Sequence, residues 1–217
     1  MNKIKDINEA VEHIKDGMTV MIGGFMAVGT PEILIDAILD KGIKDLTIIA
    51  NDTGLLDKGI GKLIMNKRVN KVIASHIGLN PETGRQMNAK ELIVDLVPQG
   101  TLIEQIRCGG AGIGGFLTET GVGTIIEEGK QKMKLGDKEY LLELPLRADI
   151  ALIRGSVVDK DGNIFYNGST RNFNPLIATA ADLVIVGAEK IVEVGELDPN
   201  YVMTPGIFVD YIVGGEK

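Results

Sequence analysis

The stretch MIGGFMAVGTPE (21–32) places glycines where an apolar run meets the signals of a helix start: Gly23 and Gly24 at one end, Gly29 at the other. Glycine adopts positive φ freely and lets another chain or a ligand approach the backbone. A helix N-terminus also offers unpaired N–H groups to an anion. The stretch therefore predicts either a tight strand-to-helix turn or a ligand-binding loop, and the glycines alone fit both.

The spacing of these glycines differs from that of known phosphate-binding loops. It does not match GxGxxG, and no Lys-Ser or Lys-Thr pair follows as it does in a P-loop. Glu32 in the first helical turn also disfavours a phosphate docked on that turn. A carbonyl oxygen, a thioester oxygen or an amide is the better fit as a ligand of this loop.

A second candidate site begins at Gln99, directly after an apolar strand at 91–97. In open α/β sheets, ligands bind beyond the carboxyl ends of the strands. We therefore expect the loops after residues 22, 50, 75 and 97 to gather at one edge, with the Gln99 amide among them. The glycine-rich stretch CGGAGIGGFLTETGVG (108–123) follows a helix predicted at 101–107. It reads as a flexible linker or, because it contains apolar residues, as a loop packed on an apolar surface.

Composition excludes several classes of function. The net charge is −7 and no Lys/Arg block occurs, so neither nucleic acid nor an anionic membrane surface is an expected partner. His13 and His76 lack neighbours at ligand spacing, so no metal site is expected. Cys108 is the only cysteine, which excludes an internal disulfide, and no run reaches the ~20 apolar residues of a membrane span. A cytoplasmic protein is expected.

Alternating helices and strands must position these loops. Asp6 is expected to cap the first helix and Thr30 the second. The pattern predicts an α/β fold: a single open, mostly parallel sheet with helices on both faces. Gly136-Asp137 predicts a β-hairpin decoration, and no linker divides the domain, 1–217. The expected helices are 7–16, 31–41, 60–67, 101–107 and 174–181, and the expected strands are 18–22, 46–50, 71–75, 91–97, 148–153, 183–188 and 206–213.

One segment, DGMTVMIGGFMAVGTP (16–31), resembles the coenzyme A transferase signature: Asp-Gly, an apolar triplet, Gly-Gly-Phe, three residues, Gly, one residue and Pro. The resemblance extends over nearly the whole chain and is nearest to the α subunits of bacterial two-subunit enzymes that act on acetate, butyrate and acetoacetate. Further similar segments are IANDTG (49–54), VIASHIGLNPETGR (72–85), LVPQGTLIEQIRCGGAGIGGFLT (96–118) and TRNFNP (170–175).

The resemblance implies a covalent mechanism shared between two subunits. In this family a glutamate attacks the acyl-CoA thioester, and a glutamyl-CoA thioester follows. That glutamate lies in the β subunit in a Ser-Glu-Asn-Gly motif, which this sequence lacks. The resemblance therefore implies a β-subunit partner, an α2β2 or higher hetero-oligomer, and coenzyme A or acyl-CoA as substrate with no permanently bound cofactor.

The resemblance also implies the site residues. The family's Pro-Gln-Gly glutamine corresponds to Gln99, whose amide would donate to the developing oxyanion. The implied coenzyme A-binding segment is Gly23, Gly24, Phe25, Met26, Ala27, Val28 and Gly29. Two other functions remain open: a non-catalytic acyl-CoA sensor, and a sugar-phosphate isomerase of similar fold. The isomerase would need its own acid–base carboxylates and a cationic phosphate site, which the sequence does not bring together.

Overall fold

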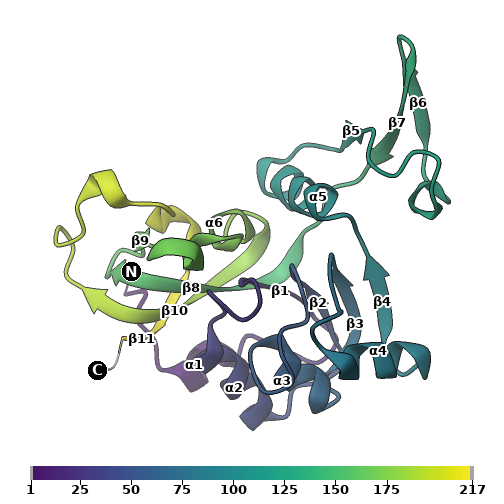
Figure 1. Cartoon of the computed structure of the whole chain (residues 1–217). Coiled ribbons are helices and arrows are strands. Elements are labelled where there is room, and N and C mark those ends of the chain that lie inside the picture. The colour runs from purple at the N-terminus through teal and green to yellow at the C-terminus, as the bar shows by residue number, and fades with distance from the viewer. Residues whose placement is uncertain (1, 216–217) are drawn as a thin grey trace.

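The computed structural model describes residues 2–215 and shows one large sheet with strand order β11-β10-β8-β1-β2-β3-β4 (Figure 1). Every neighbouring pair along this path is parallel, and only the short β9, which pairs with β8, is antiparallel. The strands are β1 (Thr19–Ile22), β2 (Leu46–Ile49), β3 (Val69–Ala74), β4 (Ile93–Leu96), β8 (Ala148–Asp159), β9 (Ile164–Phe165), β10 (Ala181–Val192) and β11 (Tyr211–Gly214).

Helices cover both faces of this sheet. Figure 1 shows α1 to α4 together on one face, and α5 and α6 on the other. The predicted α/β fold with a mostly parallel sheet is thus confirmed. The α-helices are α1 (Ile7–Val11), α2 (Glu32–Lys41), α3 (Ile60–Met65), α4 (Pro81–Asn88), α5 (Gln99–Ala111) and α6 (Asn174–Ile177). The short 3-10 helices are η1 (Ile125–Glu127), η2 (Gly168–Arg171), η3 (Pro199–Tyr201) and η4 (Gly206–Phe208).

The two faces have separate hydrophobic cores because successive side chains of a strand point to opposite sides. In β1, Val20 and Ile22 join the core beneath α2, whereas Met21 joins the core beneath α5. All three side chains are fully buried. The apolar run that precedes the glycines is therefore a strand covered on both faces, as parallel sheets require.

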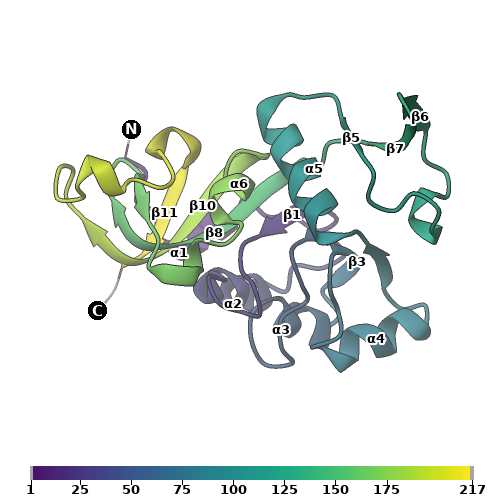
Figure 2. The ribbon, with the colours of Figure 1, turned by 45° about the horizontal axis from the view of Figure 1, so that its top comes forward.

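A three-stranded antiparallel sheet projects from the body as an arm, and both views keep it apart from the main sheet (Figure 2). Its strands are β5 (Phe116–Thr118), β6 (Lys132–Leu135) and β7 (Lys138–Glu143). The predicted hairpin turn is confirmed, with Gly136 at φ +60°. A third strand extends the predicted hairpin, since β5, from within the glycine-rich stretch, pairs with β7.

The glycine-rich stretch begins as helix, which corrects its assignment as a loop. Helix α5 runs from Gln99 to Ala111, longer than the predicted 101–107. A Cβ atom on Gly109 would collide with the carbonyl oxygen of Leu146, and one on Gly110 would collide with the Thr179 side chain. These glycines let the helix pack closely on its neighbours, and the chain leaves the helix at Gly112, where φ is +67°.

The predicted helix caps had different outcomes. Asp6 caps α1 as expected, accepting a hydrogen bond of 2.8 Å from the backbone N–H of Asn8. Thr30 does not cap α2, which starts at Glu32 after Pro31. The Thr30 side chain is buried against Gly24, where a Cβ atom would overlap its hydroxyl. The hydroxyl is therefore held in the loop and does not turn toward the helix.

Several element bounds also differ from prediction. The helices expected at 7–16 and 174–181 are shorter, and β8 and β10 continue beyond 153 and 188. The strand expected at 206–213 is observed at 211–214, because residues 206–208 form η4, in which Gly206 lies close to the Asp161 carbonyl oxygen. No helix among residues 2–215 is long and apolar enough to cross a membrane.

Candidate functional site

The glycine stretch folds into a tight turn after β1. Phe25 and Val28 exchange two backbone hydrogen bonds of 2.9 Å, which leaves Met26 and Ala27 at the tip. Both tip residues have positive φ, +50° and +64°, although neither is glycine. Such a conformation is costly for a residue with a side chain and persists only where its surroundings hold it. The side chains of Phe25, Met26 and Val28 are all exposed.

The glycines of this turn are required by the protein's own chain. A Cβ atom on Gly23 would overlap the amide oxygen of Asn174. At Gly29, where φ is +78°, a Cβ atom would lie 2.6 Å from both the Thr170 carbonyl oxygen and Asn172 Nδ2. The segment that passes close to the glycines is therefore 170–174. This favours the turn interpretation for both positions.

Asn174 is the residue that joins this segment to the turn. Its side chain is fully buried at the start of α6. Nδ2 donates to the carbonyl oxygens of Gly29, at 3.0 Å, and Thr170, at 2.8 Å, while Oδ1 accepts from the Arg154 backbone at 3.1 Å. Asn172 adds a hydrogen bond of 3.0 Å to the carbonyl of Val28. The turn is thus held from one side by two asparagines.

The sequence indicated a loop position for Gln99, but the structure makes it the first residue of α5. Its Oε1 accepts a hydrogen bond from the Ser75 hydroxyl, which follows β3. The single proton of the Ser75 hydroxyl is shared with the Asn51 carbonyl oxygen after β2, which lies 2.8 Å away. Gln99 Nε2 has no hydrogen-bond partner among residues 2–215 and is free to donate. The arrangement therefore presents an amide donor whose carbonyl end is anchored.

If Gln99 is the oxyanion donor that the resemblance implies, Ser75→Ala should reduce turnover, because the Gln99 amide would lose its anchor and shift slightly. Misplacement of a donor by a fraction of an ångström weakens its contact with the transition state, so a loss of about 10-fold in kcat is expected. Steady-state kinetics on the enzyme assembled from this chain measures the effect. Ser169→Ala, which removes an exposed hydroxyl elsewhere, is the control. A Ser75→Ala enzyme with unchanged kcat would show that the anchor is unnecessary.

The loops after residues 22, 50, 75 and 97 meet at one edge of the sheet, as predicted. Asp52 Oδ2 accepts from the Met26 backbone N–H at 2.8 Å and from Asn51 Nδ2 at 2.7 Å. From Asn51 the contacts continue through Ser75 to Gln99. A hydrogen-bonded chain therefore connects the tip of the glycine turn with the predicted oxyanion donor.

Reasoning from motifs identified Gln99 and the glycine turn but missed the residues that hold them. Asn51, Asp52 and Ser75 lie within or beside segments that resemble the family, as do Asn172 and Asn174. The sequence signal for these residues was a short polar side chain placed directly after a strand or before a proline. Their partners are distant in sequence, so the residue types alone gave no pairing.

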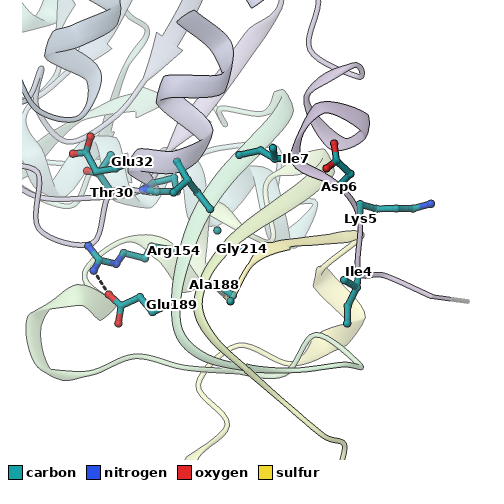
Figure 3. Close-up of a pocket in the computed structure, with 14 residues that line it drawn as sticks. Ile4, Lys5, Asp6, Ile7, Thr30, Glu32, Arg154, Ala188, Glu189 and Gly214 are labelled. Carbon is teal, nitrogen blue, oxygen red and sulfur yellow. Dashed lines mark hydrogen bonds and ion pairs between the residues drawn. The ribbon is translucent and has the colours of Figure 1, made fainter. Parts of the chain in front are cut away.

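A separate hollow of about 820 Å³ lies beside the start of α2 (Figure 3). Figure 3 shows Arg154 paired with Glu189 on one side of it and the N-terminal residues 4–7 on another. Neither Gln99 nor the turn tip lines this hollow. It is therefore distinct from the edge where Gln99 lies. Within the described part of the chain, no group of three or more His, Cys, Asp or Glu residues is placed to hold a metal ion.

The chain resembles known proteins over nearly its whole length. Residues 4–215 match the family model for coenzyme A transferase. The acetate CoA-transferase subunit alpha of Escherichia coli K12 is 60% identical over 99% of this chain and 98% of its own length. The acetoacetyl-CoA:acetate/butyrate CoA transferase alpha subunit of Clostridium acetobutylicum is 58% identical over 92% of this chain and 91% of its own.

Solved structures show the same fold. An acyl-CoA transferase of Escherichia coli O157:H7, in a thioester complex with CoA, superposes with a TM-score of 0.85 at 24% identity. This chain is covered completely but spans about half of that protein, 49%. Glutaconate coenzyme A-transferase of Acidaminococcus fermentans has a TM-score of 0.84 at 19% identity, over 97% of this chain and 75% of its own. The family match and the identities to the alpha subunits show that the chain belongs to the coenzyme A transferase family.

Proposed function

We propose that this chain is the α subunit of a short-chain acyl-CoA:carboxylate CoA-transferase acting on acetate, butyrate or acetoacetate. The observation that carries the proposal is the anchored amide of Gln99 at the carboxyl edge of the sheet, in a chain closely similar to α subunits of such enzymes. A β subunit supplies the nucleophilic glutamate, and acyl-CoA is the substrate. An α2β2 or higher hetero-oligomer is the proposed assembly, in the cytoplasm.

The reaction divides into two exchanges at the partner's glutamate. Its carboxylate oxygen attacks the thioester carbonyl carbon, the C–S bond breaks, and CoA thiolate leaves an acyl-glutamyl anhydride. The thiolate then attacks the glutamyl carbonyl and expels the free carboxylate, which leaves glutamyl-CoA. A second carboxylate then reacts with glutamyl-CoA by the reverse of these steps and leaves as its CoA thioester. Splitting the transfer in this way replaces one difficult displacement with easier ones.

Gln99 acts where negative charge develops during these attacks. As the thioester carbonyl becomes tetrahedral, its oxygen takes up the charge, and Nε2 of Gln99 donates a hydrogen bond to it. A donor fixed in advance does not have to reorganise during the reaction, which is why such donors are effective. Because Ser75 holds the opposite end of the amide, the donor is oriented before substrate arrives.

The glycine turn is proposed to contact acyl-CoA through its exposed side chains. Segment 170–174 lies against Gly23 and Gly29, so these glycines allow the turn to form without contacting substrate. The exposed side chains of Phe25, Met26 and Val28 offer apolar surface. Glu32 Oε1 accepts a hydrogen bond of 2.7 Å from the Gly59 backbone N–H, and Oε2 pairs with Lys62, so the charge of Glu32 is already engaged. An apolar portion of the substrate is therefore the better match to this turn than the pyrophosphate.

The purified chain alone is expected to show no CoA transfer, because the nucleophilic glutamate is on the partner. CoA transfer from butyryl-CoA to acetate is measured for this chain alone, for a β subunit alone, and for the two combined. We expect activity only in the combination. Turnover by a preparation free of β subunit would contradict the proposal, as would a combined preparation that binds acyl-CoA and never transfers it.

A further inference from the structure

Two neighbouring turns share the same spacing of glycines. Gly24 and Gly29 enclose the first turn, and Gly54 and Gly59 enclose a second turn after β2; all four glycines have positive φ. In both turns the first and last enclosed residues face each other in an antiparallel bridge. Gly59 packs near the first turn, because a Cβ atom there would lie 3.6 Å from the Ala27 side chain. The turns therefore lie side by side.

Asp52 is the side chain that connects them. Its Oδ2 accepts from the Met26 N–H at 2.8 Å, and its Oδ1 accepts from the Gly54 N–H at 2.7 Å. Oδ2 also accepts from Asn51 Nδ2 at 2.7 Å. The residue is only 5% exposed, so these contacts replace nearly all of its hydration. Every partner named here is a donor, which means that both oxygens must act as acceptors.

The requirement for two acceptors explains the choice of a carboxylate. Asparagine has the same shape but carries one acceptor and one donor group. Either orientation of an asparagine amide would set an NH2 group against a backbone N–H. One turn would then lose its anchor, and a buried donor would be left unpaired. An asparagine oxygen could still accept at the Met26 side, where two donors meet, so Asp52→Ala, which removes both acceptors, is the change that releases the first turn.

We propose that Asp52 is a positioning residue for acyl-chain selectivity: it holds the Met26–Ala27 tip in its positive-φ conformation and so places the apolar tip side chains beside the edge that carries Gln99. The tip needs such support because Met26 and Ala27 both have side chains, at φ +50° and +64°. The exposed Phe25, Met26 and Val28 are the side chains whose positions depend on it. The proposal rests on the proposed transferase function.

The test uses the assembled two-subunit enzyme and compares acetyl-CoA with butyryl-CoA as donor. The readout is the ratio of the two kcat/KM values, because a loss of folded enzyme lowers both values equally and leaves the ratio unchanged. We expect Asp52→Ala to shift this ratio by about tenfold, as loss of a fitted apolar contact does. Asp57→Ala removes an exposed carboxylate at the tip of the neighbouring turn and should leave the ratio as in wild type.

A second variant keeps the test decisive if Asp52→Ala fails to assemble. Met26→Ala retains the backbone N–H from which Asp52 accepts and shortens only the tip side chain, so we expect it to shift the ratio in the same direction. A wild-type ratio in an assembled Asp52→Ala enzyme would overturn the proposal, as would a wild-type ratio in Met26→Ala if the first variant does not assemble. Absence of any CoA transfer by the wild-type α and β subunits together would instead overturn the proposed function.

Discussion

Gln99→Ala in the assembled enzyme is expected to lower kcat by about 10²–10³-fold, the effect of removing one preorganised oxyanion donor (about 2.7–4 kcal/mol). Since the hydrogen bond forms as charge develops, kcat and kcat/KM should fall together and KM should change little. Stability should be nearly unaffected, because Gln99 is only half-buried and its Nε2 makes no hydrogen bond within residues 2–215. Steady-state kinetics with a thermal melt measures both quantities.

Two further variants define what the Gln99 result means. Gln99→Glu keeps the length and an acceptor for Ser75 but replaces the donor with a negative oxygen, so its loss should equal or exceed that of alanine. Gln105→Ala removes another glutamine of α5, one whose Nε2 donates a hydrogen bond to Glu143 of the arm. This variant should retain turnover. Wild-type kcat in Gln99→Ala would show that another group stabilises the oxyanion.

Gly29→Ala is expected to destabilise the protein more than Gly42→Ala does. Both glycines have similar positive φ, +78° and +72°, so the backbone strain of alanine, about 1–2 kcal/mol, is common to the two. A Cβ atom at Gly42 meets nothing within 4 Å, whereas one at Gly29 lies 2.6 Å from the Thr170 carbonyl oxygen. Overpacking of this kind adds about 1–3 kcal/mol.

Thermal unfolding of the two variants measures this difference. Each kcal/mol corresponds to about 2–4 °C in a chain of this size, so Gly29→Ala should melt well below Gly42→Ala. The comparison cancels the cost of positive φ and isolates the contact with segment 170–172. Equal melting temperatures for the two variants, with activity lost only in Gly29→Ala, would mean that Gly29 is kept free for substrate and that the turn interpretation is wrong.

The fold class could be predicted because its signals are local. Apolar runs such as 18–22 and 46–50, each followed by glycine and helix-start residues, define strands buried on both faces. Parallel strands carry their loops to one edge, which correctly placed the loop residues near Gln99. The extent of the domain, 1–217, remains a prediction, as do the coenzyme A contacts of residues 23–29.

The contacts within the site could not be predicted because they join distant segments. The hydrogen bond from Asn174 to the Gly29 carbonyl connects residues 145 positions apart, and no periodicity encodes it. Likewise, glycines at 109 and 110 resembled a loop, since nothing nearby reveals that the helix must approach Leu146 and Thr179. Local propensity was overridden by tertiary packing at each of these positions.

We propose that this chain contributes the oxyanion donor to a site whose nucleophile belongs to its partner. The most direct test is to incubate the assembled enzyme with acyl-CoA, reduce with borohydride, and determine the mass of each subunit. Borohydride converts a glutamyl-CoA thioester to the alcohol and so marks the attacking carboxylate. We expect a glutamate of the β subunit to be modified while this chain keeps its mass. A modified glutamate in this chain would contradict it.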